Sequence, residues 1–445
     1  MECAGTSNLL AMTQWRNWSS LESSDPADVV TPASVAEVAA AVTDAAERRT
    51  TVKMVGTGHS FTGIAAPEGV MLSPAALSGI LAVDRDAMTV TALAGTPLHV
   101  LNSELARLGL SLHNMGDIAE QTLAGATSTG THGTGGIKAS LSAQVSGLEM
   151  VVGDGTLVRA SRDENPDVFA AARLGLGALG VLTSLTFDVE PLGVLEAHEQ
   201  PMLWDEALAR YDEFVDANHH CDMYWFPHTD RMQVKVNNRL DLEPDEAEPL
   251  SRFRAWLDDD FLSNTAFAGV NALGNRAPGL VPRLNELSGR LLSERTYSDV
   301  PHRVFTSPRR VVFREMEYAL PRETGLAALR EVRRLIDASD WRISFPVEVR
   351  MTPADDLTLG TSSGRDSIYL AFHVNRRTDH TAYFGGVEEI LRAHDGRPHW
   401  GKVHTRTADD LAPAYPRWQE FLDLRDRLDP DRLFTNTYLR RVLGD

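Results

Sequence analysis

A histidine lies inside a glycine turn, Gly56-Thr57-Gly58-His59-Ser60, of the kind that binds a pyrophosphate. The preceding run, residues 51–55, predicts a short buried strand, so the turn begins at a strand end, where successive backbone N–H groups can converge on an anion. The dinucleotide-binding fingerprint Gly-x-Gly-x-x-Gly is absent, because Phe61 occupies the position of its third glycine. The turn therefore indicates a cofactor site that is not of the ordinary nicotinamide type.

Two further glycine-rich segments follow, at residues 124–136 and 174–180. A cofactor with a pyrophosphate and a flat ring system needs close backbone approach at several points, and glycine permits it because no Cβ intervenes. A sheet protein with glycine bends is the alternative. It accounts poorly for residues 129–135, where hydroxyl groups and N–H donors are crowded together.

Glu348 and Arg350, a carboxylate and a guanidinium, are two residues apart in a predicted strand and should share one face. An isolated pair of this kind is most often a surface ion pair. In the alternative interpretation, Glu348 engages a substrate hydroxyl while Arg350 offsets charge that develops on a reduced cofactor ring. The segment His399-Trp400-Gly401-Lys402 adds an aromatic ring, a close-approach glycine and a cation, or else is a loop with an exposed lysine.

Two other groups of residues could do different chemistry. The run His219-His220-Cys221, with His228, suggests a metal site, but adjacent histidines point to opposite faces of a strand and nothing completes a ligand set, so we predict no metal. Glu315 and Glu317 share one face of a strand, which leaves open a glycosidase-like acid/base couple. Because the glycine-rich segments indicate a large cofactor, the glycosidase-like couple is the weaker interpretation.

The composition limits the possible partners and suggests more than one domain. A chain of 445 residues exceeds what one core usually supports. The formal net charge of -19 argues against nucleic acid and anionic membrane surfaces as partners. Cys3 and Cys221 cannot form a disulfide framework, residues 1–11 lack the features of a signal peptide, and no apolar run approaches roughly 18 residues. We therefore expect a cytoplasmic enzyme without a membrane span.

Alternating strand and helix patterns predict the elements that position these residues. A capping box at Ser34 and Glu37 opens a helix that leads into the strand before the glycine turn. The glycine density falls near Glu190-Pro191, where we place a domain boundary. The expected helices are residues 35–48, 97–108 and 323–337, and the expected strands are residues 148–152, 157–160, 181–187, 223–226 and 310–313. The acidic segment 243–249 is expected to be a solvated loop.

The chain resembles the vanillyl-alcohol-oxidase class of flavoproteins. Within that class it is similar to the sugar-lactone branch, which holds L-gulono-1,4-lactone and D-arabinono-1,4-lactone oxidases and bacterial dehydrogenase relatives. The motifs that carry the resemblance are Gly58-His59-Ser60, residues 131–135, residues 176–181, Glu348-Val349-Arg350 and residues 397–402. The similarity covers nearly all of the chain from Trp15 to Gly444, and the residues before Met12 lie outside it.

The resemblance implies an α+β fold with a two-subdomain FAD-binding domain and an α+β cap domain. We assign residues 1–190 to the FAD domain, residues 191–395 to the substrate or cap domain, and residues 396–445 to a C-terminal segment that returns to the FAD domain.

The resemblance also implies that FAD is bound covalently to His59 through the 8α-methyl carbon of the flavin. His59 must then be a neutral nucleophile that the turn holds in place. The expected cofactor-binding residues are Val55, Gly56, Thr57, Gly58, His59, Ser60, Gly116, Asp117, Thr122, Gly125, Ser128, Gly130, Thr131, His132, Gly133, Gly180, Val181, His399 and Lys402.

By the same resemblance, the expected catalytic residues are Glu348, Arg350, Lys402 and His373. The implied reaction oxidises a sugar 1,4-lactone by hydride transfer from a carbinol carbon to flavin N5, with the hydroxyl proton passing to Glu348 or water. Oxygen or a redox carrier accepts the electrons, and Gly116 leaves the flavin edge less shielded than alanine would.

Two alternatives remain open. An alditol oxidase that acts on a xylitol-type polyol and produces hydrogen peroxide shares the same motifs, although His373 favours a lactone. A flavin-storing or redox-sensing protein would not need Glu348, Arg350 and Lys402 together.

Overall fold

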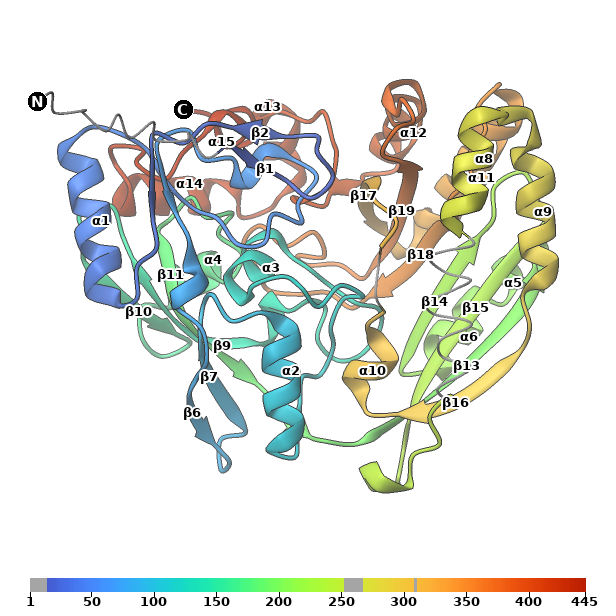
Figure 1. The fold of residues 1–445 in the computed structure, drawn as a ribbon, viewed down its shortest axis with the longest axis horizontal. Coiled ribbons are helices and arrows are strands. Elements are labelled where there is room, and N and C mark those ends of the chain that lie inside the picture. The colour runs from blue at the N-terminus through green and yellow to red at the C-terminus, as the bar shows by residue number, and fades with distance from the viewer. Residues whose placement is uncertain (1–13, 252–266, 308–309) are drawn as a thin grey trace, which may run out of the picture.

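The computed structural model describes residues 14–251, 267–307 and 310–445 (Figure 1). Cys3 lies outside the described residues. The chain forms two halves that mix helices and sheets, so the predicted α+β class is correct. Among the described helices, none combines the length and the apolar content required to cross a bilayer.

The first half contains an antiparallel sheet of order β10-β9-β11-β7-β6 and a parallel sheet of order β3-β5-β4. The same half also contains two separate two-stranded sheets, β1-β2 and β12-β8. The strands are β1 (Trp15–Arg16), β2 (Ser23–Ser24), β3 (Asp28–Val30), β4 (Val52–Met54), β5 (Val70–Leu72), β6 (Ile80–Asp84), β7 (Thr89–Leu93), β8 (Leu110–Ser111), β9 (Val145–Val151), β10 (Leu157–Ser161), β11 (Val181–Asp188) and β12 (Glu190–Pro191). The helices are α1 (Val35–Glu47), α2 (Leu98–Arg107), α3 (Leu123–Thr129) and α4 (Pro166–Ala172).

Local sequence signals explain where two of these helices begin. At α1, the Ser34 hydroxyl accepts the N–H of Glu37 at 3.2 Å, while the Glu37 carboxylate accepts the N–H of Ala33 at 2.9 Å. At α3, the Thr122 hydroxyl accepts the N–H of Gly125 at 3.3 Å. Both helices therefore begin at a hydroxyl that satisfies a free backbone donor.

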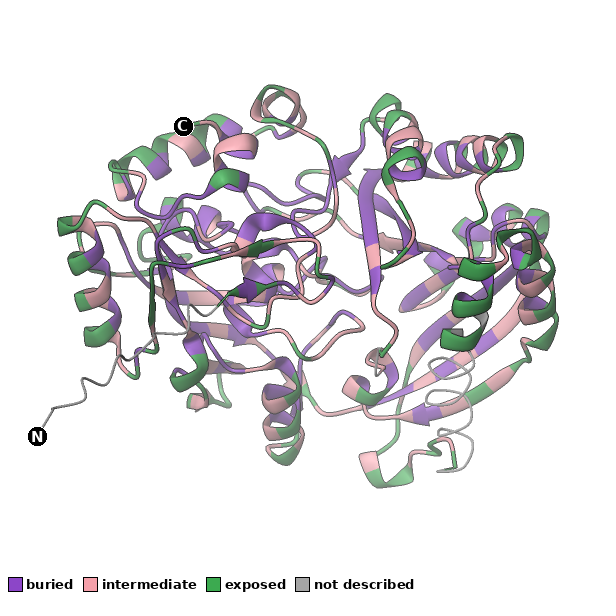
Figure 2. Cartoon of the chain, turned by 45° about the horizontal axis from the view of Figure 1, so that its top comes forward, coloured by how far each residue is buried: buried purple, intermediate pink, exposed green. Residues whose placement is uncertain are grey.

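The second half contains an eight-stranded antiparallel sheet of order β16-β13-β15-β14-β18-β19-β17-β20. Its strands are β13 (Val194–Leu203), β14 (His220–Trp225), β15 (Arg231–Leu240), β16 (Arg295–Asp299), β17 (Phe313–Pro321), β18 (Val347–Thr352), β19 (Ser367–Asn375) and β20 (Arg397–Pro398). Its helices are α5 (Trp204–Ala209), α6 (Tyr211–Ala217), α8 (Phe267–Arg276), α9 (Val281–Leu291), α10 (Pro301–Phe305), α11 (Arg322–Ala338) and α12 (Thr381–Ala393). Figure 2 shows that the strands of both halves are largely buried, whereas the helices expose residues on their outer sides.

The eight-stranded sheet has one apolar and one polar face, because successive residues of a strand point to opposite sides. Met316, Val349 and Phe372 pack with α11 and α12 in one buried apolar cluster. Apart from Ala371, the residues adjacent to them on the same strands are charged or polar: Glu315, Glu317, Glu348, Arg350 and His373. The strand pattern therefore directs a set of ionisable groups away from the helices.

The C-terminal segment contributes α13 (Ala408–Leu411), α14 (Trp418–Leu428) and α15 (Thr437–Leu443), which lie beside the first half in Figure 1. Trp400 and Phe421 share a buried apolar cluster with Leu101 of α2. The side-chain amide of Asn436 donates hydrogen bonds to the carbonyl groups of residues 63, 64 and 66 at 2.9, 3.1 and 3.0 Å. The end of the chain is thus fixed to the segment that follows the glycine turn.

One predicted strand was wrong in its position. Residues 310–312 are not in a strand, and β17 begins only at Phe313. Val311 instead packs against the aromatic cluster of Phe61, Phe313 and Phe345. Val311, which suggested a strand, therefore serves loop packing. The acidic segment contains a short 3₁₀ turn, Pro244–Glu246, none of whose residues is buried.

The contact between α11 and β19 gives a test of this packing. A Cβ at Gly325 would lie 1.6 Å from Cγ2 of Ile368, so Gly325→Ala should destabilise the protein by about 1–3 kcal/mol through overpacking. A Cβ at Gly385 of α12 would meet no atom within 4 Å, so Gly385→Ala should be neutral or stabilising by up to about 1 kcal/mol. Urea unfolding midpoints would measure both, and an unchanged midpoint for Gly325→Ala would contradict the packing.

Candidate functional site

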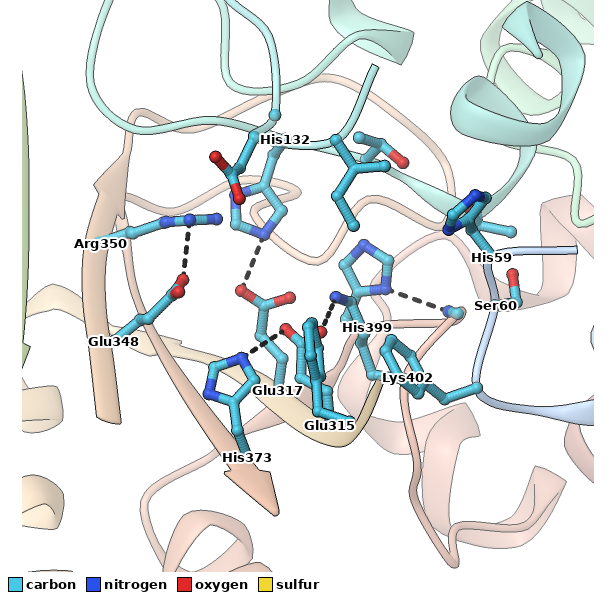
Figure 3. A pocket seen from close by; sticks show the side chains of 18 of the residues that line it. His59, Ser60, His132, Glu315, Glu317, Glu348, Arg350, His373, His399 and Lys402 are labelled. Atoms are coloured by element: carbon cyan, nitrogen blue, oxygen red, sulfur yellow. Dashed lines mark hydrogen bonds and ion pairs between the residues drawn. The ribbon is translucent and has the colours of Figure 1, made fainter. Parts of the chain in front are cut away.

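A cavity of about 260 Å³ lies between the polar face of the eight-stranded sheet and the loops of the first half. A second cavity of about 90 Å³ adjoins it and runs along the glycine turn. His59, Ser60, Gln121 and Thr129 line both. We call the larger one the polar cavity and the smaller one the glycine groove; Figure 3 shows the polar cavity from close by.

Two glycines allow the walls of the glycine groove to pack closely. A Cβ at Gly56 would lie 2.5 Å from Oγ1 of Thr122, and one at Gly180 would lie 2.6 Å from the carbonyl oxygen of Val151. Gly58 adopts the left-handed conformation, with φ of 71°. Of the predicted cofactor-binding residues, the groove is lined by Gly56, Thr57, Gly58, His59, Ser60, Thr122, Gly125, Ser128, Gly180 and Val181.

His59 stands where the groove meets the polar cavity. Its ring stacks on Trp18 with the centroids 5.6 Å apart. Burial lowers the pKa of His59, which keeps the imidazole neutral near pH 7. Its Nδ1 atom is buried and has no hydrogen-bond partner among the described residues. A neutral ring nitrogen in this state is a candidate nucleophile or ligand-binding atom.

The polar cavity also contains a large share of the predicted residues. Those that line it are His59, Ser60, Gly116, Asp117, Thr131, His132, Glu348, Arg350, His373, His399 and Lys402. All four predicted catalytic side chains are among them, although they come from β18, β19 and the loop after β20.

Glu315 is held as a carboxylate by two positive partners. The ammonium of Lys402 contacts its Oε2 atom, and Nε2 of His373 lies 3.5 Å from its Oε1 atom. Burial raises the pKa of Glu315, but Lys402 and then His373 outweigh it and lower the pKa to about 2. In return, Glu315 overcomes the effect of burial on His373 and raises the pKa of that imidazole.

Glu317 faces the first half of the chain. Its Oε1 atom lies 3.2 Å from Nε2 of His132, and both side chains are almost fully buried. Burial raises the pKa of Glu317, but His132 and Lys402 outweigh it and lower the pKa well below its usual range. The carboxylate therefore links the sheet to the loop after α3 (Figure 3).

Glu348 and Arg350 share one face of β18, with Nη2 of Arg350 lying 2.7 Å from Oε2 of Glu348. Nε of Arg350 lies 3.1 Å from Oδ1 of Asp222 on the neighbouring strand β14. The side chains of Glu348 and Arg350 are only 12% and 14% exposed, so the interpretation as a surface ion pair is wrong. Arg350 is thus fixed by two carboxylates at the edge of the polar cavity.

The histidines that suggested a metal site serve other contacts. Nε2 of His228 accepts the N–H of Ile343 at 3.0 Å, and Nδ1 of His220 contacts the carbonyl oxygen of Thr134. A different set has metal-ligand spacing: ligand atoms of His132, Glu317 and His399 lie within 4.8 Å of one another.

Local charge opposes a cation at that set. Burial lowers the pKa of His399 to about 3, and Nδ1 of His399 accepts the N–H of Gly401 at 3.0 Å. The positive charge of Lys402 acts on both His399 and Glu317. We therefore interpret the three residues as a buried charge network in which Glu317 pairs with His132.

Three predicted cofactor-binding residues line neither the groove nor the polar cavity. Gly133 lines a further cavity behind Arg350. Val55 is buried and donates its N–H to Leu72, and Gly130 ends α3 with a left-handed φ of 80°. These two residues shape the adjoining backbone.

Sequence reasoning missed the uncharged residues that complete the lining of the polar cavity. The missed residues are Phe61, Ile118, Gln121, Thr129, Phe226, Val311, Phe313, Phe345 and Pro346. It placed Glu315 and Glu317 together but not in this site. The strict polar–apolar alternation of residues 315–318 is the signal that could have joined them to Glu348 and Arg350.

Comparison with known proteins gives the family. Residues 185–442 match the family described as D-arabinono-1,4-lactone oxidase, and residues 26–161 match a family described as FAD binding domain. An L-gulono-1,4-lactone dehydrogenase of Mycobacterium tuberculosis is 40% identical over 97% of this chain and 99% of its own length. An alditol oxidase of a Streptomyces species is 34% identical over 87% of this chain and 89% of its own length.

The solved structures support the fold. A cholesterol oxidase from B. sterolicum superposes with a TM-score of 0.81 at 19% identity, covering 97% of this chain and 96% of that one. At that identity the likeness concerns the fold alone. Sequence identity, the matched families and the site geometry together lead to one conclusion: the chain belongs to the D-arabinono-1,4-lactone oxidase family, with an FAD-binding domain in its N-terminal half.

Proposed function

We propose that this protein uses FAD to oxidise a carbinol group of a sugar 1,4-lactone of the L-gulono or D-arabinono type. The observation that carries the proposal is the polar cavity, where Glu348, Arg350, His373 and Lys402 converge next to the glycine groove and His59. Family relatives named for these lactones support the substrate class.

Two features of the groove fit FAD. The glycine turn, residues 56–60, lines the groove, where its backbone can approach a pyrophosphate. The unpartnered Nδ1 of His59 lies where the groove opens into the polar cavity. Residues 1–190 and 396–445 would form the FAD domain, and residues 191–395 would cover it.

When bound, FAD supplies an oxidising ring that takes two electrons from the carbinol carbon. The chain's own residues orient the substrate and handle its proton. Glu348, whose Oε2 atom lies 2.7 Å from Nη2 of Arg350, would accept the hydroxyl proton. Arg350 keeps its positive charge between Glu348 and Asp222, where it can offset negative charge developing in the cavity.

Lys402 and His373 would bind substrate oxygens. Both are oriented by Glu315, and its negative charge raises the pKa of His373, which favours the imidazolium as a hydrogen-bond donor. A lactone carbonyl or ring oxygen accepts such bonds. An alditol is the second candidate substrate, because an alditol oxidase is among the relatives at 34% identity.

Oxygen is our proposed electron acceptor, with a redox carrier as the alternative. A Cβ at position 116 would lie 3.1 Å from the carbonyl oxygen of His132 and from Cγ2 of Thr131. Gly116 therefore leaves this wall of the polar cavity open where alanine would narrow it.

We predict that FAD is attached covalently at His59. Acid precipitation of the purified protein should leave a yellow pellet, because a covalent bond survives denaturation. In His59→Ala the flavin should appear in the acid supernatant, whether or not the variant still binds FAD. A colourless wild-type pellet would contradict the attachment and leave FAD binding itself intact.

Glu348→Gln and Arg350→Ala should each slow flavin reduction by L-gulono-1,4-lactone at least about tenfold, since loss of a transition-state charge partner commonly exceeds 1.4 kcal/mol. Anaerobic stopped-flow absorbance measures this step. Arg159→Ala is the matched control, because Arg159 makes a 2.8 Å cross-strand ion pair with Glu149 but is 66% exposed. Wild-type rates in both site variants would refute the assigned roles.

A further inference from the structure

A row of alternating charges crosses the polar face of the eight-stranded sheet. The residues directly opposite one another on β16, β13, β15, β14 and β18 are Arg295, Glu199, Lys235, Asp222 and Arg350. Nη2 of Arg295 lies 2.8 Å from Oε1 of Glu199, and Nζ of Lys235 lies 3.9 Å from the same atom. The row ends at Arg350, which also borders the polar cavity.

A further cavity of about 280 Å³ lies over this row. It shares four lining residues with the polar cavity, namely Asp117, Phe226, Pro346 and Arg350. We call it the distal chamber. A molecule bound in the polar cavity would therefore have the distal chamber next to it, on the far side of Arg350.

Two amide side chains of β15 line the distal chamber without full hydrogen bonding. Gln233 and Asn237 are 8% and 1% exposed, and their carbonyl oxygens have no hydrogen-bond partner among the described residues. A buried acceptor without a hydrogen bond has lost its contact with water and gained none in return, which is unfavourable. Two of them on one face of a strand indicate that hydrogen-bond donors bind there.

The charges that line the distal chamber indicate which kind of hydrogen-bond donor binds there. Every cation that lines the distal chamber already lies within 3.9 Å of a carboxylate oxygen, so none is left unpaired for an anionic ligand. Tyr224 and Tyr297 add ring surface and hydroxyl groups. Alternating donors and acceptors beside aromatic rings suit a neutral, hydroxyl-rich group.

We propose that the distal chamber is a second sugar subsite, which binds a glycosyl or polyol extension of the substrate whose carbinol end lies in the polar cavity. This inference rests on the proposed function for the position of the carbinol end. It extends the substrate class from single sugar units to larger, hydroxyl-rich molecules that carry a sugar unit beyond Arg350.

Equilibrium dialysis with sorbitol and maltitol tests the subsite, because maltitol is sorbitol with one added glucosyl unit. The FAD-loaded protein is photoreduced and kept under nitrogen, so neither sugar is oxidised. The wild type should bind maltitol at least about tenfold more tightly than sorbitol, and Gln233→Met/Asn237→Leu should bind the two within about twofold of each other. Gln200→Met, on the opposite face of β13 by strand alternation, should keep the wild-type preference.

Equal affinities in the wild type, or a preference that survives in the double variant, would overturn the subsite. So would a failure of the wild type to bind either sugar. Each single variant, Gln233→Met and Asn237→Leu, should reduce the preference, so the result does not depend on the double variant folding well. Turnover of L-gulono-1,4-lactone, measured separately, reports on the proposed function without involving the distal chamber.

Discussion

Two buried carboxylates on one strand, Glu315 and Glu317 of β17, hold the site together. Glu317 binds His132 of the first half, and Glu315 binds Lys402 of the C-terminal segment. The backbone reinforces both contacts, since the carbonyl oxygens of Glu317 and Glu315 accept the N–H groups of His399 and Val403 at 3.0 and 2.9 Å. Removing one partner of a buried ion pair costs roughly 3–5 kcal/mol because the other charge is left uncompensated, so both carboxylates depend on partners from distant parts of the chain.

The arrangement follows from the two faces of the sheet. Residues such as Met316 and Val349 pack against the helices, and the intervening residues are forced toward the first half of the chain. Ionisable groups buried there must be compensated, and each carboxylate of β17 has a positive or hydrogen-bonding partner within reach. The same alternation on β15 produces the lining of the distal chamber.

The sequence could predict those parts of the site that have a local sequence signal. The glycine turn before His59 and the Glu348–Arg350 spacing required only knowledge of what a glycine turn and a strand do. The burial of Glu348 and Arg350 could not be read from their spacing, because it depends on β14 supplying Asp222 and on the first half covering the sheet. Glu317 was missed as a site residue for a similar reason, since its partner His132 is far away in sequence.

Tertiary contacts also explain why some predicted positions differ from the structure. Val311 and Val312 have the composition of a strand, but the cluster of Phe61, Phe313 and Phe345 draws Val311 into loop packing before β17 begins. Val55 and Gly130 belong to motifs that line the groove, yet they support its backbone without facing it. A motif identifies a segment, and tertiary contacts decide which of its side chains reach the cavity.

The coupling between Glu317 and His132 is the most direct test of this account. Flavin reduction by L-gulono-1,4-lactone would be measured in Glu317→Gln, in His132→Gln and in the double variant. If the buried pair acts as a unit, the loss in the double variant should be well below the product of the two single losses, and the double variant should be no more than about threefold slower than the slower single variant. Losses that multiply across the two single variants would contradict the claim that this pair joins the sheet to the FAD-binding half.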